Sequence, residues 1–430
     1  MTSETARALT VRCCVVGGGP AGMMLGVLLA RAGVDVTVLE KHADFLRDFR
    51  GDTVHPSTLA ILQEMGLLER FQALPHQRVE ELRMHVGEDE LPFADFRGLQ
   101  PFPYLAFVPQ WDFLDLLADE GRRHASFALR MRTEATGVLT KAGRVVGLEA
   151  HDPDGPVRIH TDLVVATDGR DSTIRRAAGL EPERLGAPMD VLWFRMSRRP
   201  DDPEAPFGRI DRGQMMVLIN RGDYWQAAYL VPKGTAVRLR REPVSELRAR
   251  VASLVVFLAD RVSELRTWDD VSLLEVRVDR LRRWHLPGLL LIGDAAHAMS
   301  PIGGVGINLA IQDAVAAANE LAAPLAAGQP IAEARLARIQ KRRLFPTRVV
   351  QGVQVVLQRR VVAPALQGGA TTPRLPAVMR WLLRWRVVRS IPARLFGLGI
   401  RREHVRSRRA DDDGSAAQCP RRDSNTRPPD

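Results

Sequence analysis

The stretch that decides the fold runs from Val11 to Gly22 and reads VRCCVVGGGPAG. Its apolar run ends in three glycines, and apolar side chains then recur at roughly helical spacing through Leu29. Residues 34–39, VDVTVL, alternate as a strand does, and Glu40 follows them. The order of strand, tight turn, helix and strand predicts a βαβ unit.

The glycines of this turn have the spacing Gly17-x-Gly19-x-x-Gly22. In a βαβ unit the first glycine permits the sharp turn, the second lets the backbone approach a pyrophosphate, and the third lets the helix pack closely on the strand. Pro20 and Ala21 open the helix, where the missing N–H of proline costs little. Glu40 follows Gly22 by 18 residues and is placed to accept hydrogen bonds from a ribose. We therefore expect these six residues, Gly17, Gly19, Pro20, Ala21, Gly22 and Glu40, to bind a dinucleotide; the alternative is a glycine-rich turn without a ligand.

Composition narrows the class of protein. The chain has 430 residues, 45% of them hydrophobic and 26% charged, which predicts two or three globular domains and excludes a disordered chain or a polytopic membrane protein. Its three cysteines have neither a disulfide nor a zinc spacing, and no histidine pair has metal-ligand spacing, so no metal is expected. With no export signal and no stretch of about 18 apolar residues, we expect a cytoplasmic protein.

The net charge of +10 is unevenly distributed. Residues 331–430 hold 22 basic and 7 acidic residues, a net +15, whereas the rest of the chain is at −5. Only four of the 61 basic residues are lysine, and no nucleic-acid recognition motif accompanies the charge, so we expect no nucleic-acid partner. Between Val378 and Leu395 arginines alternate with apolar residues. This pattern favours either a helical cap with solvated arginines, which would also serve a homodimer interface, or a helix on an anionic membrane surface.

Glycines alone do not distinguish a site for FAD from a site for NAD, but two further segments do. Residues 166–175, ATDGRDSTIR, and residues 293–297, GDAAH, followed by Pro301-x-Gly303-x-x-Gly306-x-Asn308, are similar to fingerprints of the class A FAD-dependent aromatic hydroxylases. The chain therefore resembles this p-hydroxybenzoate hydroxylase-like family over about residues 10–405. The resemblance implies an α/β fold, with a Rossmann-like (GR2-type) FAD-binding domain, an inserted antiparallel-sheet substrate domain and C-terminal helices.

The expected domains are discontinuous in sequence. Strands are expected at 144–151, 157–161 and 163–166, and a helix at 244–260. The predicted ranges are 10–80, 104–187 and 283–330 for FAD binding, 81–103 and 188–282 for the substrate sheet, 331–405 for basic helices, and 406–430 for a disordered tail.

The resemblance also implies a set of cofactor contacts. Asp294 ends a buried strand, where its carboxylate can accept hydrogen bonds from ribityl or ribose hydroxyls, and the turn before Asn308 opens a helix whose amides can stabilise negative charge on a reduced flavin. Surface ion pairing or helix capping is the alternative for Arg50 and Gln110, a simple Asp-Gly turn for Asp168, and solvation for Lys41. The full set implied is Lys41, Arg50, Gln110, Ala135, Asp168, Gly169, Gly293, Asp294, Pro301, Gly306, Ile307 and Asn308.

Candidates for the substrate pocket come from the expected sheet and from one loop. Trp225 and Tyr229 share one face of a strand, and Trp193 and Met215 lie on neighbouring strands. His55 lies near the expected flavin loop. Core packing is the alternative for the four sheet residues, and a helix-start or surface histidine is the alternative for His55. His297 is expected to brace its turn, and no protein residue is assigned as catalytic.

The activity implied by the resemblance is that of a monooxygenase. NADH or NADPH would reduce FAD, O2 would add to give a flavin C4a-hydroperoxide, and its oxygen would hydroxylate an aromatic or polycyclic small molecule. The alternative is a dehydrogenase, reductase or epoxidase of the same fold that acts on a prenyl lipid or quinone.

Overall fold

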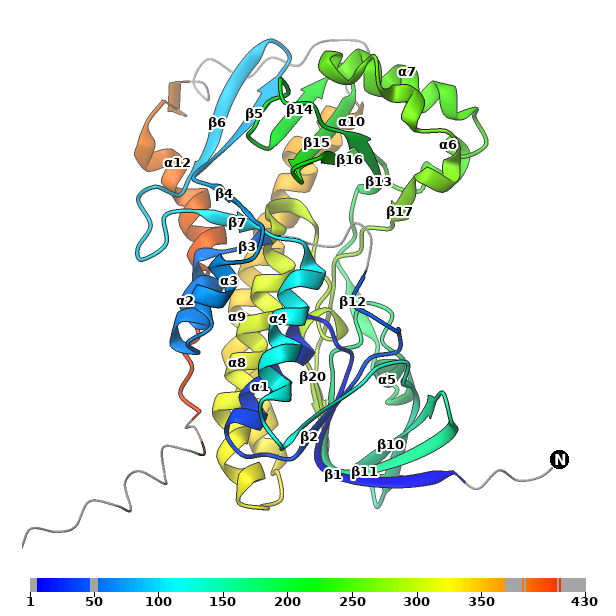
Figure 1. Ribbon diagram of the computed structural model, residues 1–430, viewed down its shortest axis with the longest axis vertical. Coiled ribbons are helices and arrows are strands. Elements are labelled where there is room, and N and C mark those ends of the chain that lie inside the picture. The colour runs from blue at the N-terminus through cyan, green and yellow to red at the C-terminus, as the bar shows by residue number, and fades with distance from the viewer. Residues whose placement is uncertain (1–5, 47–52, 368–380, 383, 408–409, 411–430) are drawn as a thin grey trace, which may run out of the picture.

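Two large β-sheets form the framework of the chain (Figure 1). The computed structural model describes residues 6–46, 53–367, 381–382, 384–407 and 410. The eight-stranded sheet lies at one end of the molecule and the seven-stranded sheet at the other, and long helices run beside both.

The eight-stranded sheet has β1 at its centre, in the order β19-β20-β11-β1-β2-β8. β1 pairs in parallel with β2 and β11, and β11 pairs in parallel with β20. The carboxyl ends of these four strands therefore meet at one edge, which is where parallel α/β sheets bind ligands. The strands are β1 (Arg7–Val16), β2 (Val36–Leu39), β8 (Phe127–Arg130), β9 (Glu134–Lys141), β10 (Arg144–Asp152), β11 (Gly155–Ala166), β19 (His285–Leu286) and β20 (Leu289–Leu291).

A layer of helices covers one face of this sheet (Figure 1). α1 (Pro20–Arg31) is buried from Ala21 to Arg31 and packs against α8 (Val305–Ala326) and α4 (Gln110–Arg122). α9 (Glu333–Leu357) packs against α8 in turn. The apolar residues of α1 and α8 join β1 in one core cluster, so burial on both sides holds the start of each helix at the sheet edge.

The seven-stranded sheet is antiparallel except where β14 pairs with β5, and its order is β17-β13-β16-β15-β14-β5-β6. Apolar residues of α7 (Val244–Leu254) pack on one face, and those of α10 (Ala363–Gln367) pack on the other. The strands are β5 (Glu81–Val86), β6 (Asp89–Asp95), β13 (Met189–Ser197), β14 (Phe207–Asp211), β15 (Gln214–Asn220), β16 (Tyr224–Pro232) and β17 (Ser272–Leu274).

Shorter elements connect the two sheets. β3 (Thr53–Val54), β7 (Leu105–Phe107) and β4 (Gln77–Val79) form a three-stranded sheet, and β12 (Pro182–Arg184) pairs with β18 (Asp279–Leu281). The remaining helices are α2 (Pro56–Glu64), α3 (Leu68–Gln72), α5 (Thr173–Ala177), α6 (Ala236–Leu239), α12 (Arg386–Ala393) and the π-helical turns η6 (Gln358–Val362) and η7 (Arg394–Leu398).

The predicted fold class, a Rossmann-like domain with an inserted and largely antiparallel sheet, is confirmed. Two local predictions are wrong. Residues 157–161 and 163–166 belong to one strand, β11, because β1 pairs with it along its whole length. The helix expected at 244–260 ends at Leu254, since Val255 is extended and the buried Leu258 continues in a 3-10 turn.

The domain boundaries stay predictions. Of the expected tail, only residues 406, 407 and 410 are described. No helix within the described ranges has the length and apolarity needed to cross a bilayer.

A buried ion pair anchors the outer face of the seven-stranded sheet. Arg261 donates to both carboxylate oxygens of Asp202, at 2.7 and 2.8 Å, and Trp225 Nε1 donates to Asp202 at 2.9 Å. Both charged side chains are 4% exposed. Burial raises the pKa of Asp202, but the hydrogen bonds from Arg261 outweigh burial and hold that pKa well below its usual value.

The substitution Asp202→Asn should destabilise the protein, because it leaves the buried Arg261 with only the exposed Asp260, 3.4 Å away, as a counter-charge. We expect the free energy of unfolding, measured by chemical denaturation, to fall by about 3 kcal/mol. Asp119→Asn is the matched control, since Asp119 forms an exposed pair with Arg122 elsewhere on the surface and such pairs contribute little. An equal loss in both variants would contradict the assignment.

Candidate functional site

Three distant chain segments meet at the carboxyl edge of the eight-stranded sheet. Gly17 has φ +105°, and a Cβ there would lie 2.6 Å from the carbonyl oxygen of Thr167. A Cβ on Gly293 would lie 3.3 Å from that of Ala21, at the start of α1. Thr167 Oγ1 also donates to the Gly17 carbonyl at 2.8 Å. The structure thus brings together the neighbourhoods of Gly17, Asp168 and Asp294, which the sequence places far apart.

The amino terminus of α1 is open toward this edge. Gly19 is its N-cap, without a side-chain hydrogen bond, and the first turn contains no acidic residue. A Cβ on Gly19 would meet nothing within 4 Å, whereas a Cβ on Gly22 would lie 1.9 Å from the Gly17 carbonyl oxygen. The first-turn amides lack helical acceptors, so this end can bind an anion such as a phosphate.

Glu40 lies at the carboxyl end of β2, beside the glycine turn. Its carboxylate accepts hydrogen bonds from the backbone N–H of Gly18 at 3.0 Å and of His42 at 3.1 Å, and His42 Nδ1 lies 2.5 Å from it. The side chain is 12% exposed, so it keeps an accessible edge. Lys41 is exposed, and Arg50 lies outside the described residues.

Asp168 lies in the second of these segments, residues 166–175, between the end of β11 and the start of α5. One carboxylate oxygen accepts the Ile174 N–H at 3.2 Å, whereas Oδ1 is buried and has no hydrogen-bond partner among the described residues. Burial is the main cause that raises the pKa of this carboxyl. Gly169, at φ +84°, turns the chain in open space. An unpaired buried oxygen at this position is typical of a site that awaits a donor.

Asp294 faces the second segment. Its Oδ2 lies 3.3 Å from Arg170 Nη2, and the two side chains are 32% and 29% exposed. Arg175 stabilises the turn that contains Asp294, because its Nη1 donates to the Ala295 carbonyl at 3.0 Å. A part-exposed pair of this kind is weak, so the Asp294 carboxylate remains available to hydroxyl donors.

A buried charge cluster braces the turn that contains Gly293 and His297. His297 Nε2 lies 2.5 Å from Asp313 Oδ2, which also accepts the Gly293 N–H at 3.2 Å. Arg343 Nε donates to Asp313 Oδ1 at 2.8 Å, and its Nη1 lies 3.4 Å from Glu403. Burial raises the pKa of Asp313, but His297 and Arg343 outweigh burial and hold that pKa below its usual value. His297 thus occupies the bracing position expected of it.

The turn from Pro301 leads into α8. Gly303 and Gly304 have φ of +80° and +61°, and a Cβ on Gly306 would meet only Met299, at 3.9 Å. The Asn308 side chain accepts from the His55 N–H and Thr58 Oγ1, both at 2.8 Å, and donates to the Thr53 carbonyl at 2.9 Å. Since the amide of Asn308 is fully used, its backbone and that of Ile307 are what remain for a ligand.

His55 is fully buried behind this turn. Its Nδ1 lies 2.7 Å from the Phe396 carbonyl oxygen, and the residue is 0% exposed. Burial is the main cause that lowers the pKa of His55 to about 4. His55 is the N-cap of α2, which agrees with the helix-start alternative. Its buried Nε2 has no hydrogen-bond partner among the described residues, and the substrate contact stays a prediction.

The four residues expected to line the substrate pocket lie on two opposite faces of the sheet. Trp193 and Met215 share a cluster with Ile302, from the turn before α8. Trp225 and Tyr229 pack instead with the apolar side of α7. Tyr229 donates to Gln214 at 3.0 Å, and burial raises its pKa to about 12. The expectation of one common wall is wrong, because the period-2 alternation of strands separates the pairs.

Two further residues expected to contact FAD, Gln110 and Ala135, differ in burial. Gln110 is the first residue of α4 and half-buried. Ala135 is buried in β9 among the apolar residues that include Leu39 and Ile174.

Comparison with known proteins agrees with this geometry. A family model described as an FAD binding domain matches residues 10–353. The 6-methylpretetramide 4-monooxygenase of Streptomyces rimosus is 33% identical over 365 residues, which cover 84% of this chain and 87% of that protein. The chain is a class A FAD-dependent monooxygenase.

Solved structures of similar proteins show the same fold. An anhydrotetracycline hydroxylase from Streptomyces rimosus has a TM-score of 0.69 at 25% identity, covering 90% of this monooxygenase and 76% of that chain. The p-nitrophenol 4-monooxygenase of Pseudomonas putida has a TM-score of 0.69 at 19% identity, covering 91% and 94% of the two chains.

The residues of the monooxygenase fit FAD. The open space over Gly19 is a cradle that a Cβ would fill, and the buried Asp168 Oδ1 lacks a donor. We propose that α1 binds the pyrophosphate, Glu40 the adenosine ribose, and Asp294 the ribityl hydroxyls.

Several residues of the site could not be identified from the sequence motifs. Asp313 carried a signal, since a lone carboxylate in the apolar helix run LAIQDAVAAA indicates a buried partner. Thr167 and Arg170 lie within the segment 166–175, but the motif gave them no role, because their contacts with Gly17 and Asp294 cross the sheet edge.

Substitution of the two glycines should separate binding from folding. Gly19→Ala places a methyl group where the structure is open, so the apoprotein should keep its melting temperature while FAD affinity falls at least about tenfold. Gly22→Ala collides with the Gly17 carbonyl and should lower the melting temperature itself. Flavin fluorescence titration and thermal unfolding of apoprotein measure the two effects, and a G19A variant with full FAD affinity would contradict the cradle.

The buried His55 should make stability depend on pH. The unfolded state takes up a proton below about pH 6.5, whereas folded His55 stays neutral down to a pKa of about 4. The stabilisation is therefore complete above pH 6.5 and is lost as pH falls toward 4, by about 3 kcal/mol in total. Denaturation of wild type and His55→Gln between these values measures it; an unchanged pH slope in the variant would refute the assignment.

Proposed function

We propose that this monooxygenase hydroxylates an aromatic or polycyclic small molecule, with NADH or NADPH as the reductant. The observation that carries the proposal is the convergence of Gly17, Asp168 and Asp294 on one slot, beside a sheet face that reaches the turn before α8. A relative that shares a third of the sequence is named for hydroxylation of 6-methylpretetramide, which supports a polycyclic substrate.

Each part of the site has a separate task. The amides of α1 and the carboxylates of Glu40 and Asp294 bind and orient the cofactor. The first turn of α8, at Ile307 and Asn308, presents amides that stabilise negative charge on its ring system. When bound, reduced FAD supplies activated oxygen for transfer to the substrate.

The apolar face around Trp193 and Met215 supplies the second requirement, which is a dry chamber. Met215 is 7% exposed and lies with Ile302, Val191 and Leu230 in one cluster. Apolar walls exclude water from the reacting centre and hold a flat substrate by contact area. The chain can therefore assist mainly by orientation and exclusion of water.

Turnover with labelled oxygen tests the proposal. Purified protein should contain FAD, and a polycyclic phenol such as a tetracycline precursor should accelerate NAD(P)H oxidation and yield product that contains one 18O atom from 18O2. Trp193→Ala should raise KM for that substrate while FAD content stays unchanged, because Trp193 lies on the sheet and not in the cofactor slot.

Two outcomes would contradict the proposal. Product formation under strict anaerobiosis would indicate a dehydrogenase or reductase. Hydroxylated product that contains no 18O would show that the added oxygen comes from water.

A further inference from the structure

The C-terminal part of the chain carries an uninterrupted positive segment. Between Gln358 and Arg402 the sequence contains ten arginines and no lysine, aspartate or glutamate. Arginine is weakly hydrated and binds phosphate bidentately, so such a segment is suited to contact with a phosphate-rich surface.

α12, within this segment, exposes apolar side chains while one of its arginines is largely covered. Arg389 is 16% exposed and donates to Glu81 at 2.8 Å, and Arg386 Nε lies 3.3 Å from the buried Asp95. Val387 and Ile391 are 73% and 60% exposed. A surface helix normally turns its apolar side toward the core. Here Arg389 is held against β5, Arg386 reaches Asp95 on β6 while 61% exposed, and the apolar Val387 and Ile391 face outward as well.

Aromatic residues extend the exposed apolar side. Trp381 and Trp385 are each 55% exposed, and their ring centroids lie 5.6 Å apart in an edge-on arrangement. With Leu382, Val387 and Ile391 they form what we call the tryptophan patch. These five make up nearly half of the large apolar side chains exposed in the described part of the chain, all within eleven residues. A concentration of this kind marks an interaction surface.

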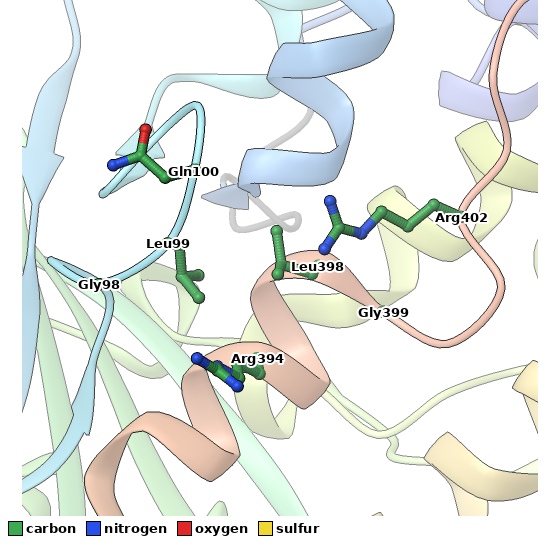
Figure 2. A pocket seen from close by; sticks show the side chains of 7 residues that line it. All are labelled: Gly98, Leu99, Gln100, Arg394, Leu398, Gly399 and Arg402. Atoms are coloured by element: carbon green, nitrogen blue, oxygen red, sulfur yellow. The ribbon is translucent and has the colours of Figure 1, made fainter. Parts of the chain in front are cut away.

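A cavity of about 430 Å³ begins where α12 ends (Figure 2). Arg394 and Arg402 line it from the C-terminal segment, with Leu398 between them, and Leu99 and Gln100 line it from the opposite loop. Neither Arg394 nor Arg402 forms an ion pair with any residue that the structure describes. The cavity therefore offers two free guanidinium groups beside apolar contacts, which suits a phosphate that carries an apolar tail.

We propose that the tryptophan patch and the Arg394–Arg402 cavity dock the protein on an anionic lipid surface. Tryptophan is enriched at membrane interfaces, and arginine beside it gains from the negative potential of anionic lipids. The helix would lie in the interface and would not span it. This proposal is independent of the assigned reaction.

Charge favours a lipid surface over a second copy of the chain. A symmetric dimer through this patch would place the same arginine-rich surface on both sides of the interface. Like charges in contact oppose such an association. An anionic bilayer instead supplies the opposite charge and an apolar layer at the depth that Trp381 and Trp385 can reach.

Vesicle co-sedimentation with the full-length holoprotein tests the proposal. Wild type should bind vesicles of an equimolar mixture of phosphatidylcholine and phosphatidylglycerol, bind phosphatidylcholine vesicles poorly, and be released by high salt. The double variant Trp381→Ser/Trp385→Ser should bind the mixed vesicles at least about tenfold more weakly, because it removes the apolar contact. Val387→Asn should weaken binding, whereas Val256→Asn, at 74% exposure on another face, should not.

A second pair of variants tests the cavity. Arg394→Gln/Arg402→Gln should lose most of the preference for phosphatidylglycerol, whereas Arg238→Gln/Arg241→Gln, which removes two exposed charges near α6, should keep it. Equal losses in the two arginine variants would overturn the cavity assignment. Absence of binding to the mixed vesicles, or a dimer in sedimentation velocity that the double tryptophan variant dissociates, would overturn the docking proposal.

Discussion

The site depends on contacts that only a residue without a Cβ allows. Gly17 and Gly22 lie so close to the backbone at Thr167, and to each other, that a single methyl group would overlap a carbonyl oxygen. Gly293 repeats the constraint against α1 and α8. The segments around Gly17, Asp168 and Asp294 touch through these glycines. The positions of Asp168 and Asp294 therefore follow from backbone packing. Parallel strand pairing brings the three segments to the same edge of the sheet, and the glycines allow their backbones to approach closely.

The buried charge cluster extends this arrangement to the far end of the chain. Asp313 is a helix residue that accepts a hydrogen bond from Gly293, at the carboxyl edge of the eight-stranded sheet, and another from Arg343, which also lies near Glu403. Removal of one member would leave an unpaired charge in the interior, a cost far above the net contribution of the intact cluster. The cluster thus couples the residues after η7 to the turn that contains Asp294, although more than a hundred residues separate them.

The parts that the sequence predicted are those whose physics is local. The glycine spacing after Val16, the hairpin before Ala166 and the apolar period of α8 each report a turn or a burial pattern within a few residues. The face on which Trp225 lies could not be predicted, because alternation tells which residues share a face but not which face meets the turn before α8. The surroundings of His55 could not be predicted for a similar reason. Its ring meets the carbonyl oxygen of Phe396, which follows it by 341 residues.

The segment from α12 to η7 connects the outer surface with the interior. Its outward side carries the tryptophan patch, and within the next turn the ring of Phe396 packs on Gly303, at the start of the turn that leads to Ile307 and Asn308. The Phe396 carbonyl oxygen also accepts a hydrogen bond from His55 Nδ1, so Phe396 is held both by ring packing and by a hydrogen bond. A shift of α12 on a lipid surface would therefore act on the turn through a short, rigid path. Burial of Phe396 and Gly397 resists such a shift, which favours docking of the preformed surface over a rearrangement of the site.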